Sequence, residues 1–84
     1  MIAFLKGKKI SIKPTKVIVD VNGVGYEVTI PLSTYEKISS VATIELYIAM
    51  VVRENSVALY GFSSEEEKQM FAILTSIPGV GPSI

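Results

Sequence analysis

Residues 17–30, Val-Ile-Val-Asp-Val-Asn-Gly-Val-Gly-Tyr-Glu-Val-Thr-Ile, decide the fold of this 84-residue chain. Apolar residues occupy every second position on both sides of the Asn22-Gly23 step. Two such runs around an Asn-Gly step are the strongest short-range signal of a β-hairpin, because the favoured two-residue turn needs positive φ angles. We therefore predict two antiparallel strands that meet at Asn22-Gly23.

Further strand patterns lie on both sides of this hairpin. Residues 2–7 and 9–14 precede it, and Gly7 is placed where a first strand could bend. Residues 43–53 follow it, Glu54-Asn55-Ser56 makes a tip, and residues 57–62 return as a strand. In the long run, one face is predicted to hold the apolar residues Ile44, Leu46, Ile48, Met50 and Val52.

A short helix is expected between the third and fourth strands, over residues 32–38. Pro31 ends the strand before it, and Ser33 with Glu36 fits the S/T-x-x-E capping box, so Ser33 is the expected N-cap. Five to six short strands with one helix in this place are typical of a small Greek-key barrel, the oligonucleotide-binding (OB) fold. A small open sheet or an SH3-like barrel fits the same pattern. The predicted class is mainly β, an OB-fold barrel followed by a C-terminal α-helix.

The pattern changes from strand to helix at residue 63. Ser63 with Glu66, or Ser64 with Glu67, fits a capping box. An apolar stripe of helical period follows at Met70, Phe71, Leu74 and Ile77. We divide the chain into an OB domain, 1–62, and the opening of a second, helical domain, 63–84.

The composition excludes several classes of site. The chain has no Cys and no His, which excludes disulfides and makes zinc centres and His-based triads very improbable. It has no Walker A sequence and no catalytic constellation. The expectation is therefore no catalytic residue, no metal and no cofactor. The longest apolar stretch, residues 46–52, is too short to span a bilayer, and the N-terminus does not resemble a signal peptide. We expect a cytoplasmic protein without a membrane partner.

The charge is unevenly distributed. Eight basic residues balance eight acidic ones, but residues 1–16 hold five lysines and no acid. A solvated lysine edge that discourages aggregation explains this segment, and a local patch for phosphate is the alternative.

The C-terminal Pro78-Gly79-Val80-Gly81-Pro82 is how a helix-hairpin-helix motif begins. Its glycines let the backbone turn tightly and approach a ligand, so that N–H groups can point at a phosphate. The second helix of such a motif is missing from this chain. An ordinary Gly/Pro-rich tail is the alternative reading.

Several short segments, in order, resemble one family. They are Met1-Ile2, residues 21–28, residues 51–55, residues 59–62, Phe71 and residues 79–82. Together they resemble the N-terminal part of the RuvA family, the Holliday-junction-binding subunits of the bacterial branch migration complex. The resemblance covers essentially the whole chain, and each piece alone is weak. It implies that the chain is an N-terminal fragment, which reaches only into the first helix-hairpin-helix motif.

The resemblance implies a non-catalytic DNA-binding subunit in recombination, repair and the SOS response. Such subunits form homotetramers that hold four-way junction DNA open without reading its sequence. Their ATP-hydrolysing partner, the RuvB motor, binds through a C-terminal domain that is absent here. The alternative is an OB-fold module for single-stranded nucleic acid or for oligomerisation.

The resemblance also assigns site residues. Glu54 and Asn55 match the acidic pin at the junction centre, where the family carries two adjacent acids, so this pin holds one carboxylate per subunit. Gly79, Val80, Gly81 and Ser83 match the phosphate-binding hairpin. Ser83 stands where the family often has Lys, and the hairpin amides are therefore expected to carry more of the contact.

Overall fold

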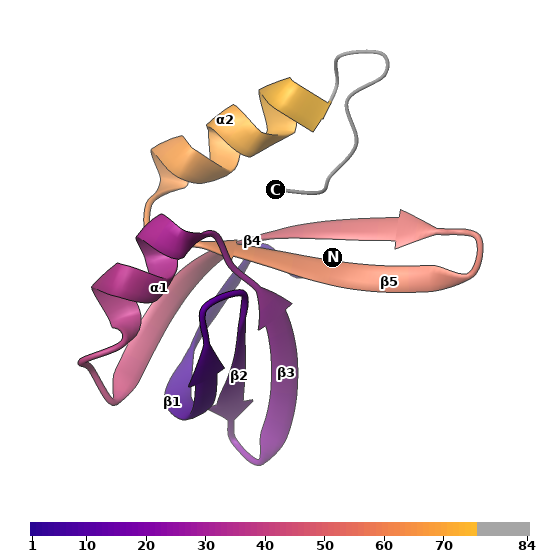
Figure 1. Ribbon diagram of the computed structural model, residues 1–84. Coiled ribbons are helices and arrows are strands. Elements are labelled where there is room, and N and C mark those ends of the chain that lie inside the picture. The colour runs from indigo at the N-terminus through magenta and orange to yellow at the C-terminus, as the bar shows by residue number, and fades with distance from the viewer. Residues whose placement is uncertain (76–84) are drawn as a thin grey trace.

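A computed structural model describes residues 1–75 of the chain. Within this range there are five strands and two helices (Figure 1). In chain order they are β1 (Phe4–Lys13), β2 (Lys16–Val21), β3 (Val24–Thr29), α1 (Leu32–Ile38), β4 (Thr43–Arg53), β5 (Ser56–Phe62) and α2 (Glu65–Thr75). The predicted class, a mainly β barrel followed by a helix, is confirmed.

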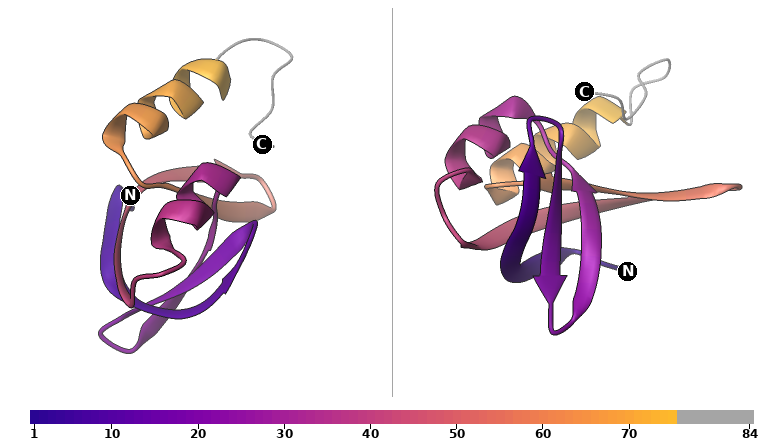
Figure 2. Two further views of the ribbon diagram at one scale, coloured as in Figure 1. Left: turned by 60° about the vertical axis from the view of Figure 1, so that its left-hand side comes forward. Right: turned by 60° about the horizontal axis from the view of Figure 1, so that its bottom comes forward.

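The strands close into a barrel in the order β1-β2-β3-β5-β4. Neighbouring strands are antiparallel except β3 and β5, which run parallel and are joined at Thr29 and Tyr60. α1 connects β3 to β4, and Figure 2 shows it beside the barrel from two further sides. This strand order with a helix in this place is consistent with the OB fold.

The β2–β3 hairpin forms as its sequence predicts. Val21 pairs with Val24 across a two-residue turn, and the φ angles of Asn22 and Gly23 are 51° and 90°. The backbone N–H of Gly23 donates to the Asp20 carboxylate at 2.8 Å, which closes the turn. Positive φ at both central positions matches the twist of the two strands, and this is why Asn-Gly is favoured here.

β1 is one continuous ten-residue strand, whereas the sequence pattern predicts two runs, 2–7 and 9–14. Its first half pairs with β4 and its second half with β2, and Lys8 is paired on both sides, with Thr43 and Asp20. Gly7 lies where β1 passes close to β2. A Cβ atom there would collide with the backbone of Asp20 and come within 3.0 Å of the Val21 side chain.

The barrel encloses one apolar core. Its buried members are Leu5, Val17, Val19, Val28, Ile30, Ile38, Ile44, Leu46 and Ile48. The predicted apolar face of β4 supplies the last three of these. The same face continues to Val52, which is 61% exposed because β4 extends past the barrel.

The expected N-cap at Ser33 is wrong. α1 begins at Leu32, its N-cap position is Pro31, and no side chain caps it. Pro31 has the extended backbone that is usual at an N-cap, with φ −77° and ψ 163°, and its missing N–H has no partner to lose in the helix. The other end of α1 is held by Lys9, whose ammonium donates to the carbonyls of Ile38 and Ser39 at 3.1 and 2.6 Å.

α2 begins with the second of the two predicted capping boxes. The N–H of Glu67 donates to the Ser64 hydroxyl at 3.2 Å. Of the predicted apolar stripe, Phe71 is buried, whereas Met70 and Leu74 are exposed and Ile77 lies outside the described residues. The helix therefore meets the barrel mainly through one aromatic side chain. Within residues 1–75, no helix is long and apolar enough to cross a membrane.

Candidate nucleic-acid interface

The β4–β5 hairpin extends away from the barrel and ends in the predicted tip (Figures 1 and 2). The strands stay in register from Tyr47 and Phe62 at the barrel to Arg53 and Ser56 at the far end. Glu54 and Asn55 form the two-residue connection, and both are exposed. Because a paired ribbon supports it, the tip places a carboxylate well clear of the core.

The Glu54 side chain makes no hydrogen bond or ion pair with any other of residues 1–75. Its charge is therefore available to a partner or to solvent. A lone exposed carboxylate repels a DNA phosphate, and at physiological salt this repulsion acts over about 8 Å. The Glu54 carboxylate can thus help to keep a nucleic-acid backbone at a distance.

One face of the hairpin near the tip is apolar. Val52 and Val57 lie opposite each other in the ladder and are 61% and 60% exposed. Met50 and Leu59, the next pair on the same face, are half-buried. A projecting ribbon with an exposed apolar face is suited to contact with another protein surface.

The lysines of residues 1–16 divide into two groups. Lys9 holds the end of α1, and Lys16 forms an exposed ion pair with Glu27 at 3.6 Å. The other three, Lys6, Lys8 and Lys13, are exposed, and their ammonium groups make no hydrogen bond or ion pair within residues 1–75.

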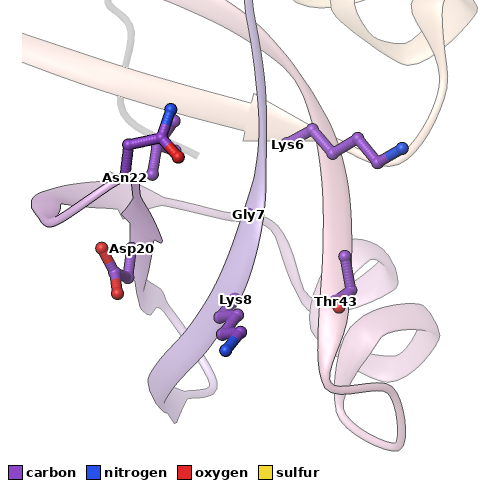
Figure 3. Close-up of a pocket in the computed structure, with 7 residues that line it drawn as sticks. Lys6, Gly7, Lys8, Asp20, Asn22 and Thr43 are labelled. Atoms are coloured by element: carbon purple, nitrogen blue, oxygen red, sulfur yellow. The ribbon is translucent and has the colours of Figure 1, made fainter.

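Lys6 and Lys8 line a surface hollow together with Asp20, Asn22 and Thr43 (Figure 3). The side chain of Lys6 extends away from Asp20 and Asn22, so the polar groups do not converge on one point. The negative charge of the Asp20 carboxylate would also repel an anion bound in this hollow. This segment fits the solvated lysine edge better than a built phosphate site.

A polar cluster joins α2 to α1. The Glu67 carboxylate accepts hydrogen bonds from the hydroxyls of Ser63, Ser33 and Ser64 at 2.8, 3.0 and 3.3 Å. It also lies 3.7 Å from the ammonium of Lys37. Partial burial raises the pKa of Glu67, but Ser63, Ser33, Lys37 and Ser64 together outweigh this, and the pKa lies below its ordinary value. Glu67 is therefore ionised at neutral pH.

The aromatic residues are mostly committed to packing. Tyr60 and Phe62 both contact Phe71, at centroid distances of 5.1 and 5.2 Å, and so pack between the barrel and the helix. Phe4, at 43%, is the one exposed aromatic residue among residues 1–75, and its ring lies 5.3 Å from that of Tyr47. Base-stacking surfaces of single-strand binders need several exposed rings. This distribution disfavours the single-strand alternative.

The structure brings Glu54 and Asn55 together at one tip, as the sequence predicts. The other predicted site residues, Gly79, Val80, Gly81 and Ser83, lie outside the described residues. Sequence reasoning missed the contact of Glu67 with α1. The capping box indicates the Ser64 bond, but no local pattern indicates a partner 34 residues away. Among residues 1–75, no three acidic, His or Cys side chains are grouped to hold a metal ion.

Residues 1–61 match the family model described as RuvA N terminal domain. The chain is 46% identical over 84 residues to a protein of Pelobacter propionicus and 46% identical over 85 residues to one of Geotalea daltonii. It is 40% identical over 84 residues to a protein of Flavobacterium psychrophilum. Each relative bears the name Holliday junction branch migration complex subunit RuvA. All of this chain is covered in each match, but it spans only 42%, 43% and 44% of these relatives' lengths.

Proposed function

Because the chain belongs to the RuvA N-terminal domain family, we propose that it supplies the barrel and the acidic pin of a subunit that binds four-way DNA junctions. The observation that carries this proposal is the β4–β5 hairpin, which projects from the barrel and ends in the unpaired carboxylate of Glu54. The binding is to the DNA backbone and to the shape of the junction, without readout of base sequence.

The pin acts by repulsion at the point where strands cross. DNA carries one negative charge for about every 1.7 Å of duplex length, so backbones that converge on a carboxylate are pushed apart. Asn55 keeps the size of an aspartate but adds no charge. Each subunit therefore contributes one pin carboxylate, and the repulsion is weaker than a doubly charged pin would give.

Attraction comes from a separate segment. The amides of Gly79, Val80 and Gly81, with the Ser83 hydroxyl, bind backbone phosphate at the start of a second domain, 63–84, that follows the OB domain, 1–62. Glycine-flanked amides form anion-binding concavities without needing a positive side chain. The neutral total charge of the chain is compatible with this mode of binding.

The subunit works as a homotetramer that brings four pins to the junction centre. The exposed Val52 and Val57 support this assembly, since contact between hairpins near the centre would cover both. The subunit is non-catalytic. An ATP-hydrolysing motor, RuvB, drives branch migration in the cytoplasm during recombination and repair, and it binds a part of the subunit that lies outside these 84 residues.

A gel-shift titration tests the proposal. We compare the 84-residue chain with a chimera in which it replaces the matching part of the Pelobacter propionicus relative. The chimera should bind a synthetic four-way junction about 100-fold more tightly than a duplex of the same length, because several weak sites engage one junction together. The 84-residue chain should bind both weakly. Equal affinity of the chimera for junction and duplex would overturn the proposal.

A further inference from the structure

Glu67 connects two helices that are far apart in the sequence. Its carboxylate lies on the first turn of α2, and two of its partners, Ser33 and Lys37, lie on α1 beside the barrel. Its other partners, Ser63 and Ser64, belong to the segment that leads into α2. The Glu67 side chain therefore links the start of α2 to α1.

The partners of the Glu67 carboxylate are divided between its two oxygens. Oε1 accepts from Ser63 and Ser64 and lies 3.7 Å from the Lys37 ammonium, whereas Oε2 accepts from Ser33. The side chain is 30% exposed, so water screens these interactions less than it would at an open surface. Hydrogen bonds to a charged group are stronger than those between neutral groups.

α2 also contacts the barrel strands β4 and β5. Phe71 packs against Tyr60 and Phe62, and the Lys68 ammonium reaches the carbonyl of Ala3 at 3.5 Å. Phe71 is the one buried residue of α2 within residues 65–75. Glu67 gives the helix a second attachment, one turn earlier.

We propose that Glu67 is a positioning residue, which fixes the orientation of α2 on the barrel through its contacts with Ser33 and Lys37 of α1. Resting on the proposed function, this orientation sets where the chain leaves α2 at Thr75, and hence where the phosphate-binding segment begins relative to the pin. If α2 can pivot, the phosphate-binding segment and the pin no longer keep a fixed relative position. They then cannot both fit the same junction.

A purely local role for Glu67 is the competing account, since its carboxylate also accepts hydrogen bonds from Ser63 and Ser64 at the start of α2. The two accounts differ on Ser33 and Lys37. These side chains take no part in the N-cap of α2, so removing them leaves the cap intact. The positioning role requires that their loss loosens α2, whereas the local role requires that it does not.

The test measures the distance between two spin labels by double electron–electron resonance. The chain has no cysteine, so Val24→Cys on β3 and Met70→Cys on α2, both more than half exposed, give unique labelling sites. Ser33→Ala with Lys37→Ala should widen the distance distribution at least twofold, and Glu67→Ala should do the same. Glu67→Gln keeps an acceptor oxygen and should restore part of the sharpness. The control is Glu36→Ala, an exposed residue of the same helix α1.

An unchanged distribution in the Ser33→Ala, Lys37→Ala variant would overturn the proposal, even if Glu67→Ala disorders α2. In the chimera, the same double variant should weaken junction binding about fivefold, the upper end for an exposed ion pair. If the parent chimera does not prefer the junction, the proposed function is wrong, but the spin-label distances still decide the role of Glu67. If the distribution widens while junction binding is unchanged, the link to DNA is wrong.

Discussion

Phe71 of α2 stacks against Tyr60 of β5, with ring centroids 5.1 Å apart and ring planes 30° apart. Tyr60 is also the residue through which β5 pairs with β3. The helix therefore docks on the strand pair that closes the barrel. We expect the docking of α2 and the pairing of β3 with β5 to be lost together on unfolding.

Replacing Phe71 with Ala should lower the free energy of unfolding by about 3 kcal/mol, because a buried ring that contacts Tyr60 and Phe62 is removed. Urea unfolding followed by circular dichroism measures this. Met70→Ala, one residue earlier but 57% exposed, should change stability by less than about 0.5 kcal/mol. Equal effects of the two variants would show that Phe71 does not anchor the helix.

Replacing Gly61 with Ala should destabilise the barrel by about 1–3 kcal/mol through overpacking. A Cβ atom there would lie 2.6 Å from Val28 Cγ1 and 3.2 Å from Leu46 Cδ1, and both side chains are in the core. Gly25→Ala is the matched control, since its nearest neighbour would be Ile18 Cγ2 at an ordinary 3.6 Å. Thermal unfolding of the two variants should separate them clearly, and a stable Gly61→Ala protein would contradict the packing.

Replacing Lys9 with Met should cost about 1 kcal/mol, because the last carbonyls of α1 lose a charged donor. Methionine keeps the apolar part of the side chain, so the loss of stability measures the contribution of the ammonium group. Lys8→Met, on the adjacent position of the same strand and without a partner in residues 1–75, should be close to neutral. Amide exchange should also accelerate at the end of α1 in the Lys9 variant alone. If the Lys9→Met and Lys8→Met variants behaved alike, the Lys9 ammonium would not stabilise the end of α1.

The contribution of Glu67 to stability should depend on pH. Its pKa is lower in the folded chain than the ordinary value of 4.5, because the hydroxyls of Ser63, Ser33 and Ser64 and the charge of Lys37 outweigh the effect of burial. A lowered folded-state pKa means that the stabilisation is complete above pH 4.5 and is lost as the pH falls through the folded-state value.

Glu67→Gln should therefore be less stable than the parent at pH 7, and this difference should shrink at pH 3. Urea unfolding at the two pH values measures it. Glu66→Gln, on the exposed neighbouring residue, should show no such trend. A difference between Glu67→Gln and the parent that is the same at both pH values would mean that the carboxylate charge is irrelevant.

The charge of the pin should tune junction binding in the chimera. Asn55→Asp adds a second carboxylate and should weaken binding to the four-way junction about two- to threefold at low salt, whereas Glu54→Gln should strengthen it by a similar factor. Both effects should diminish as salt is raised, and duplex binding should not change. Gel-shift titrations at two salt concentrations measure this. An effect of equal size on duplex would place the tip away from the junction centre.

Local sequence predicted those parts of the fold that local chemistry decides. The Asn22-Gly23 turn needs only its own φ angles, and the capping of α2 by Ser64 needs only its neighbours, so the sequence predicts both. Ser33 carried a valid capping pattern, yet its hydroxyl binds Glu67 on another helix. Val52 continued a perfect alternation beyond the point where the core ends. Neither outcome was visible locally, because each depends on which distant segment lies alongside.

The closure of the barrel by β1 and β5 sets the order in which the chain can fold. β1 must find β4, some forty residues later, with Phe4 opposite Tyr47, and β3 is joined to β5 only at Thr29 and Tyr60. The β1-β2-β3 meander can form while residues 1–30 leave the ribosome. Its β1 edge then stays open until residues 43–47 of β4 arrive, and its β3 edge until Tyr60 of β5 arrives. Such long-range pairing makes folding slow, on the order of milliseconds to seconds. The lysines of β1 protect the β1 edge until it is paired, because charged side chains discourage pairing with another nascent chain.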